Sequence, residues 1–112
     1  MIDGQESLRC ALISAREEAY LWELIGDFQG RFPEASIPEC ERAARDAAST
    51  LLTNGWAQLI RTTWASSSGA GAVTRAEALE ALLSAQNWSP PPTNQDPCFH
   101  LLITESGREQ PF

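Results

Sequence analysis

The sequence predicts a small α+β domain in which three to four helices pack against a small antiparallel β-sheet. Three observations support this fold class. Apolar residues recur at helical spacing through the first half of the chain. A helical pattern then stops at Asn54-Gly55 and runs directly into WAQLIRTTW, which is rich in aromatic and β-branched residues. A second such run, CFHLLI, lies near the carboxyl end, and we expect all 112 residues to form a single domain, 1–112.

The first helix is predicted over residues 7–28, because its apolar residues recur at three- and four-residue steps and therefore share one face. These residues are Leu8, Leu12, Ala15, Ala19, Trp22 and Ile25. A Gly and a Pro soon afterwards end the pattern. Ser14 and Glu17 also have the spacing of a capping box. The helix could therefore begin at Ser14, which would leave residues 8–13 as a short strand.

The second helix has clear signals at both ends. Ser36 and Glu39 form a capping box, in which each side chain can satisfy a backbone amide of the first turn. Gly55 follows Asn54 and supplies the left-handed residue that commonly closes a helix. Apolar residues at helical spacing between these ends predict one buried stripe. The stripe consists of Cys40, Ala44, Ala47, Ala48, Leu51 and Leu52.

The second half of the chain predicts two strands separated by a long insertion. Residues 56–64 form the first strand and residues 98–103 the second. Between them, the Ser- and Gly-rich residues 66–72 are expected to be a flexible loop. A capping box at Thr74 and Glu77 then opens a short helix that ends before three consecutive prolines. Its inward residues are expected to be Leu79, Leu82 and Leu83.

Two phrases in the chain resemble a winged helix-turn-helix domain. Residues 51–59, LLTNGWAQL, are similar to the turn from the last core helix into the wing, and residues 103–108, ITESGR, are similar to the end of the return strand. The resemblance implies a small winged-helix-like fold whose helix before Gly55 contacts DNA or a protein. Two departures accompany it: the second helix of the motif is shortened, and residues 66–97 insert a helix into the wing.

The charge of the chain argues against a nucleic-acid partner. Fifteen acids stand against eight arginines, giving a net charge of −7 and a sequence pI of about 4.5. Such a field repels a polyanion, whose binding requires a cation for each phosphate contact. DNA contacts, if present, would come from Arg42, Arg45 and Arg61. Acids at Glu39, Glu41 and Asp46 surround the first two.

No pattern of catalytic or metal-ligating residues appears in the sequence, so we expect neither an enzyme nor a cofactor. Cys98 and His100 alternate along the second predicted strand, but two ligands do not make a zinc site. The other cysteines, Cys10 and Cys40, lie far apart in apolar surroundings, which predicts buried free thiols rather than disulfides. With no signal-peptide or membrane-spanning pattern, we expect a cytoplasmic protein with no membrane contact.

A protein partner is the expected ligand. The four tryptophans and Tyr20 leave two alternatives open: all of them fill the core, or a surplus aromatic side chain lies at the surface as a partner anchor. Trp56 and Trp64 are expected to point to one face of their strand. We expect Trp88 to be an exposed anchor flanked by Glu77 and Glu80. The predicted function is a non-catalytic acidic module that binds a basic protein, as a regulator, antitoxin or immunity protein would. The alternative is a winged-helix transcriptional regulator that binds DNA as a homodimer.

Overall fold

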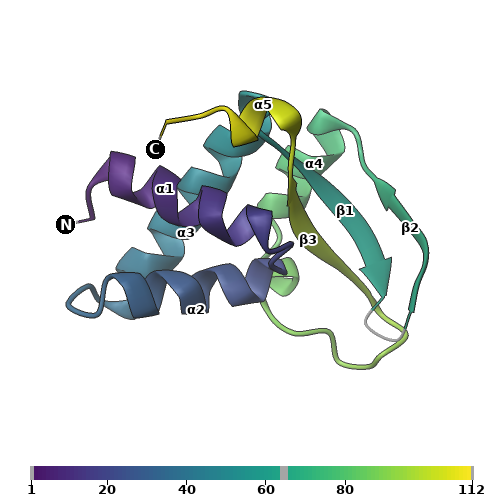
Figure 1. Cartoon of the computed structure of the whole chain (residues 1–112). Helices are drawn as coiled ribbons and strands as arrows, with labels where there is room; N and C mark the ends of the chain where they lie inside the picture. Colours follow the sequence, from purple (N-terminus) through teal and green to yellow (C-terminus); the bar gives the residue numbers. More distant parts are fainter. Residues whose placement is uncertain (1, 64–65, 112) are drawn as a thin grey trace.

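The computed structural model describes residues 2–63 and 66–111, and for residues 66–70 it describes the backbone alone. Three helices come first, and a small sheet interrupted by a helical segment follows (Figure 1). The elements are α1 Gly4–Arg16, α2 Leu21–Arg31, α3 Ile37–Thr53, β1 Ala57–Thr63, β2 Ser66–Ala72, α4 Arg75–Leu82, the 3₁₀ helix η1 Ala85–Trp88, β3 Pro97–Ile103 and α5 Glu105–Arg108. The predicted α+β class with a small antiparallel sheet is confirmed.

The single helix predicted over residues 7–28 is wrong, because the chain reverses within it. Helix α1 ends at Arg16, and α2 begins at Leu21. Between them Glu18 adopts a left-handed conformation with φ of 56°, which a helix interior does not accommodate. The apolar face of the predicted helix is therefore divided between two helices that pack against each other.

The alternative start at Ser14 is also wrong. Helix α1 begins near the amino end of the chain, where the Asp3 carboxylate accepts the backbone N–H of Glu6 at 3.0 Å. Ser14 lies buried inside the helix, and its hydroxyl donates to Asp27 Oδ2 of α2 at 2.7 Å. Its side chain thus ties the two helices together instead of capping one, and residues 8–13 are helical rather than a strand.

Helix α3 matches its sequence signals closely. All six residues of the predicted stripe are buried, and Gly55 closes the helix with φ of 73°. The Ser36 hydroxyl accepts the Glu39 amide N–H at 3.3 Å, as predicted. The other half of the capping box differs, because Glu39 Oε2 accepts the backbone N–H of Ile2 at 3.1 Å. This bond connects the amino-terminal segment to the first turn of α3.

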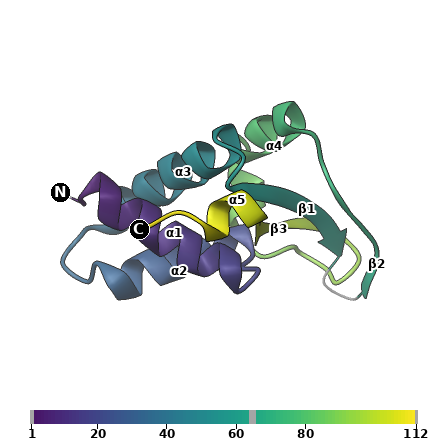
Figure 2. The same cartoon turned by 45° about the horizontal axis from the view of Figure 1, so that its top comes forward.

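The sheet contains three antiparallel strands in the order β2-β1-β3. The loop predicted over residues 66–72 is wrong: this segment is strand β2, in which Ala72 pairs with Ile60 and Gly71 with Arg61 of β1. Ser, Gly and Ala have low β propensity, but hydrogen bonding between backbones does not require large side chains. Figures 1 and 2 show β2 at the outer margin of the sheet, away from α1, α2 and α3.

Strands β1 and β3 hold the sheet against the helices. They pair in one regular register from Ala57 with Ile103 to Thr63 with Pro97. Side chains on the inner face are buried among α1, α3 and α4. They come from Ala57, Leu59, Leu101 and Ile103. The predicted common face of Trp56 and Trp64 cannot be followed, since Trp64 lies outside the described residues.

The two phrases that suggested a winged helix lie in direct contact. The Thr104 hydroxyl donates to the Gly55 carbonyl oxygen at 2.7 Å, and the Thr104 amide donates to the Trp56 carbonyl oxygen at 3.0 Å. Gly107, in the short helix α5, is buried against the same Trp56 carbonyl. A Cβ at this position would overlap that oxygen and would come within 2.8 Å of Ile103 Cγ1. Only glycine fits this junction without movement of the backbone.

We predict that Gly107→Ala destabilises the fold by about 2 kcal/mol or more, because the added methyl group overlaps a backbone carbonyl. Chemical denaturation measures the change. Gly26→Ala is the matched control, because a Cβ there meets no atom within 4 Å on an exposed face of α2. The same substitution should raise stability there by about 0.5–1 kcal/mol. Equal effects at the two positions would show that the junction is not closely packed.

Candidate functional site

Helix α3 lies between two grooves and contributes side chains to both. Its buried stripe faces the core, so its opposite side is directed outward between α1 and α4. One groove, of about 610 Å³, lies between α1 and α3, and we name it the α1/α3 groove. The other, of about 500 Å³, lies between α3 and α4 and is named the α3/α4 groove. Asp46 lines both, so the outer side of α3 and the two grooves form one continuous surface.

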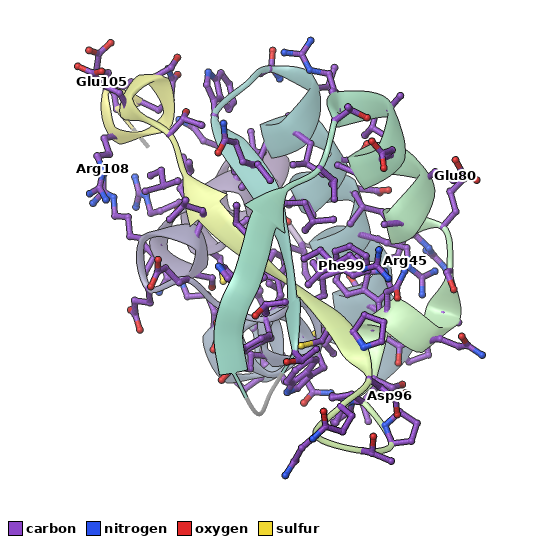
Figure 3. The ribbon with its side chains drawn as sticks, turned by 90° about the vertical axis from the view of Figure 1, so that its right-hand side faces the viewer. Arg45, Glu80, Asp96, Phe99, Glu105 and Arg108 are labelled. Carbon is purple, nitrogen blue, oxygen red and sulfur yellow. The ribbon has the colours of Figure 1, made fainter. Side chains whose placement is uncertain are left out.

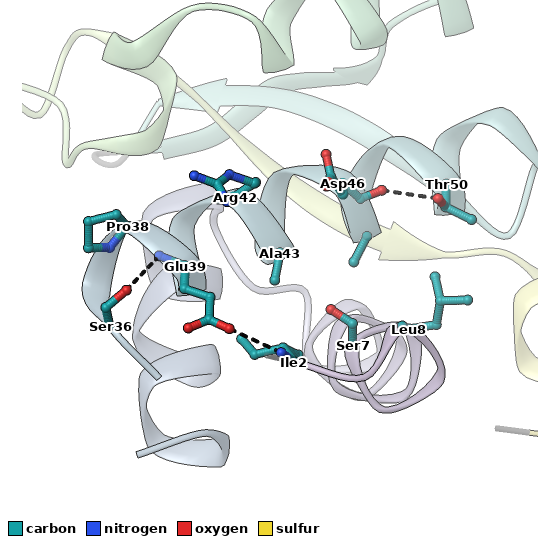
Figure 4. Close-up of a pocket in the computed structure, with 12 residues that line it drawn as sticks. Ile2, Ser7, Leu8, Ser36, Pro38, Glu39, Arg42, Ala43, Asp46 and Thr50 are labelled. Carbon is teal, nitrogen blue, oxygen red and sulfur yellow. Dashed lines mark hydrogen bonds between the residues drawn. The ribbon is translucent and has the colours of Figure 1, made fainter. Parts of the chain in front are cut away.

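The α1/α3 groove has apolar walls and a polar rim (Figure 4). Leu8 of α1 and Ala43 of α3 line it. Its charged groups are Glu39, Arg42 and Asp46. The hydrogen bond between Ile2 and Glu39 described above closes one end, and it is drawn in Figure 4.

The α3/α4 groove carries the most exposed large apolar side chain among the described residues. Leu83 is 83% exposed, although it was predicted to face inward with Leu79 and Leu82. The inward residues of α4 are instead Ala78 and Leu82, one turn apart. Leu79 follows Ala78 and Leu83 follows Leu82. Because each residue of a helix is rotated by about 100° from the one before it, Leu79 and Leu83 point towards the groove instead of the core. Leu79 is half-buried there, and Leu83 projects from the end of the helix.

Trp88 is not the exposed anchor that the sequence suggested. Its side chain is only 5% exposed, and its indole N–H donates to the Leu82 carbonyl oxygen at 2.9 Å. That carbonyl is one of those left without a helical partner at the end of α4, so the indole satisfies it. The Arg45 guanidinium lies 5.7 Å from the centre of the Trp88 ring. Trp88 therefore belongs to the core and holds Arg45 beside the groove through a cation–π contact.

The two acids predicted to flank the site, Glu77 and Glu80, have different surroundings in the structure. Glu80 is exposed and lines the α3/α4 groove together with Arg45. Figure 3 shows both on the side of the molecule formed by α3 and α4, far from Glu105 and Arg108 of α5. Glu77 is engaged in capping α4, since its Oε1 accepts the Thr74 hydroxyl at 2.8 Å and the Thr74 amide at 3.4 Å. Only Glu80 of the pair is thus placed at a groove.

The three arginines considered for DNA contacts lie in different places. Arg42 lines the α1/α3 groove, and Arg45 lines the α3/α4 groove. Arg61 is exposed on β1, opposite Phe99 of β3, and lines neither groove. Asp46 shares each groove with its arginine. The structure therefore brings arginines and carboxylates together on α3, as the sequence indicated.

The three cysteine thiols, which a nucleophilic reaction or a metal site could use, are all buried. Burial raises the pKa of the Cys10 thiol to about 11, and the Asp27 carboxylate adds to the shift. Burial likewise raises the pKa of Cys40 and Cys98, so all three are poor sources of a thiolate. The described ranges hold no group of three or more His, Cys, Asp or Glu side chains that could bind a metal ion.

One aromatic cluster was missed by the sequence analysis. Tyr20 stacks on Trp22 with ring centres 4.5 Å apart, and His100 meets Tyr20 edge-on at 5.6 Å. Burial lowers the pKa of His100, while the Glu18 carboxylate opposes the shift. The Leu101 amide also donates to the Ala19 carbonyl at 2.9 Å, so the turn between α1 and α2 covers the edge of β3. The sequence analysis placed Tyr20 inside one long helix, so it did not predict that this residue pairs with His100 of β3.

No protein-family model, curated protein or solved structure matches the chain. The resemblance to winged helix-turn-helix domains therefore rests on the two phrases and the order of elements, and it stays a prediction. Within residues 2–63 and 66–111, no helix has both the length and the apolar character needed to cross a membrane.

We predict that Trp88→Ala lowers the free energy of unfolding by about 3–5 kcal/mol, as is usual for a large buried aromatic residue. Trp88→Phe is the control, since it keeps a buried aromatic ring and most of the apolar volume but removes the indole N–H. It should cost clearly less, about 1–3 kcal/mol, from the loss of the bond to Leu82. Thermal or urea denaturation compares the variants. Wild-type stability of Trp88→Ala would show that this side chain is not part of the core.

We also predict a loss of stability at alkaline pH that depends on Cys10. Its folded pKa of about 11 lies above the usual value of 9.0, so the folded protein keeps the proton longer than the unfolded chain. The associated stability is complete below pH 9 and is lost as the pH rises through 11. Unfolding curves of wild type and Cys10→Ala from neutral to alkaline pH test this. The variant should lose less stability over this range, and parallel curves would contradict the assignment.

Proposed function

We propose that the protein is a non-catalytic binding module that engages a protein partner through the outer side of α3 and the α3/α4 groove. The observation that carries this proposal is Leu83, which is 83% exposed beside that groove. Leu83 shares the lining of this groove with Leu79 and Leu82, so it belongs to a contiguous apolar patch, the kind of surface feature that marks a protein contact. Burial of Leu83 by a partner would remove this exposure.

The surroundings of Leu83 have the composition of a protein interface. Leu79 and Leu82 supply an apolar centre, and Arg45 and Glu80 supply a polar rim. Such a centre with a charged rim is typical of protein contacts, in which arginine is enriched. The contact of Arg45 with Trp88 also limits the motion of the guanidinium, so less entropy is lost when a partner orders it.

The net charge of −7 favours a partner with a basic surface. A field of this sign increases the rate at which a positively charged protein reaches the site. Regulators, antitoxins and immunity proteins that block a basic target fit this description. Binding of DNA, the alternative, has less support, because Asp46 stands beside both Arg42 and Arg45 and opposes phosphate contacts. Three buried thiols suit the reducing cytosol, which is the compartment we propose.

We predict that Leu83→Asp reduces recovery of the partner roughly tenfold or more, since it places a charge at the centre of the contact. The measurement is affinity purification of the full chain from its source cells with quantitative mass spectrometry. Ile37→Asp is the matched control, because Ile37 is 58% exposed at the start of α3 and lines neither groove. It should retain wild-type recovery. Equal loss with both variants, or recovery that nuclease treatment abolishes, would contradict the proposal.

A further inference from the structure

The outer edge of the sheet at β2 is a second surface with a definite geometry. In the sheet order β2-β1-β3, β2 pairs with β1 on one side, and no other described segment pairs with it on the other side. Extensive contacts within the described residues join β2 to β1 alone. Figures 1 and 2 show the strand running along the margin of the molecule. The pairing of β2 with β1 is regular at Gly71 and Ala72 and shifts register between Arg61 and Thr63. At its regular end, β2 therefore directs backbone groups away from the fold.

The orientation of these groups follows from one hydrogen bond. The Val73 amide donates to the Leu59 carbonyl oxygen at 3.1 Å, so the N–H of Val73 points towards β1. Amide directions alternate along a strand. The N–H of Ala72, which pairs with Ile60, therefore points outward. This N–H can donate to a carbonyl of a further strand without loss of any bond to β1.

The two edges of the sheet differ in protection. The edge at β3 is covered by the turn that contains Ala19 and Tyr20. Soluble proteins commonly protect an edge with charged side chains or proline. Residues 62–74 contain neither, and this uncharged stretch includes the whole of β2. In a molecule with a net charge of −7, such a stretch is a place where a second negatively charged molecule meets little local repulsion.

We propose that β2 pairs antiparallel with β2 of a second copy of this chain across a two-fold axis. The two three-stranded sheets then form one continuous sheet. The contact is isologous, since each strand offers the same outward amides and carbonyls to the other. A basic peptide is a less suitable occupant, because the strand has no carboxylate with which to select it.

The test is the association constant of the purified full chain, measured by sedimentation over a roughly hundredfold range of concentration. We expect a monomer–dimer equilibrium that added salt strengthens, because salt screens the repulsion between two like-charged copies. Ala72→Pro should weaken association roughly tenfold or more, since proline removes the outward N–H and leaves the bond from Val73 to β1 intact. Ala72→Thr is the matched control. It keeps the N–H, favours the strand and should retain the dimer.

A second measurement on the wild-type chain does not depend on how proline is tolerated. Exchange of the Ala72 amide with deuterium should slow as protein concentration rises, whereas the Val73 amide, already bonded to Leu59, should be protected throughout. A protein that remains monomeric at every concentration overturns the proposal. A dimer also overturns it if Ala72→Pro does not weaken association and the exchange rate of the Ala72 amide does not change with protein concentration. Leu83→Asp should still dimerise, so failure here and failure of the partner site are separate outcomes.

Discussion

The packing of Gly107 and Thr104 against the backbone of Gly55 and Trp56 is the constraint on which the rest of the fold depends. It fixes the end of β3 beside the start of β1, so the pairing of Ala57 with Ile103 is set at this point. Because Gly55 also closes α3, the same contact sets where that helix leaves the sheet. The outward side of α3 and both grooves take their positions from it.

The parts of the fold that were predicted correctly have local physical causes. Helix α3 has its cap, its stripe and its closing glycine within its own sequence, and the structure confirms all three. The break between α1 and α2 was missed because Glu18 adopts a left-handed conformation that glycine or asparagine would normally signal. Strand β2 was missed because it is recognised by its backbone pairing with β1, which a run of small residues does not reveal.

The candidate site shows the same division between local and long-range causes. The sequence indicated that the inserted helix contributes exposed groups, and Glu80 is exposed and lines the α3/α4 groove. It could not show which apolar side chain is exposed. Trp88 is buried because the end of α4 offers a carbonyl to its indole, and Leu83 is exposed because one residue of rotation turns it from the core. Both depend on how α4 sits against α3, which contacts far apart in sequence decide.

The pairing of β1 with β3 has a consequence for the order of folding. The contact of Ala57 with Ile103 closes a long segment of chain, and closing a long loop costs entropy before any contact rewards it. The helices α1, α2 and α3 follow one another in the chain and contact one another across shorter connections, so they can associate first. If α4 then docks on α3, the segment that remains to be closed becomes shorter. The insertion between the strands would in this way shorten the loop to be closed and bring β3 towards helices that have already packed together.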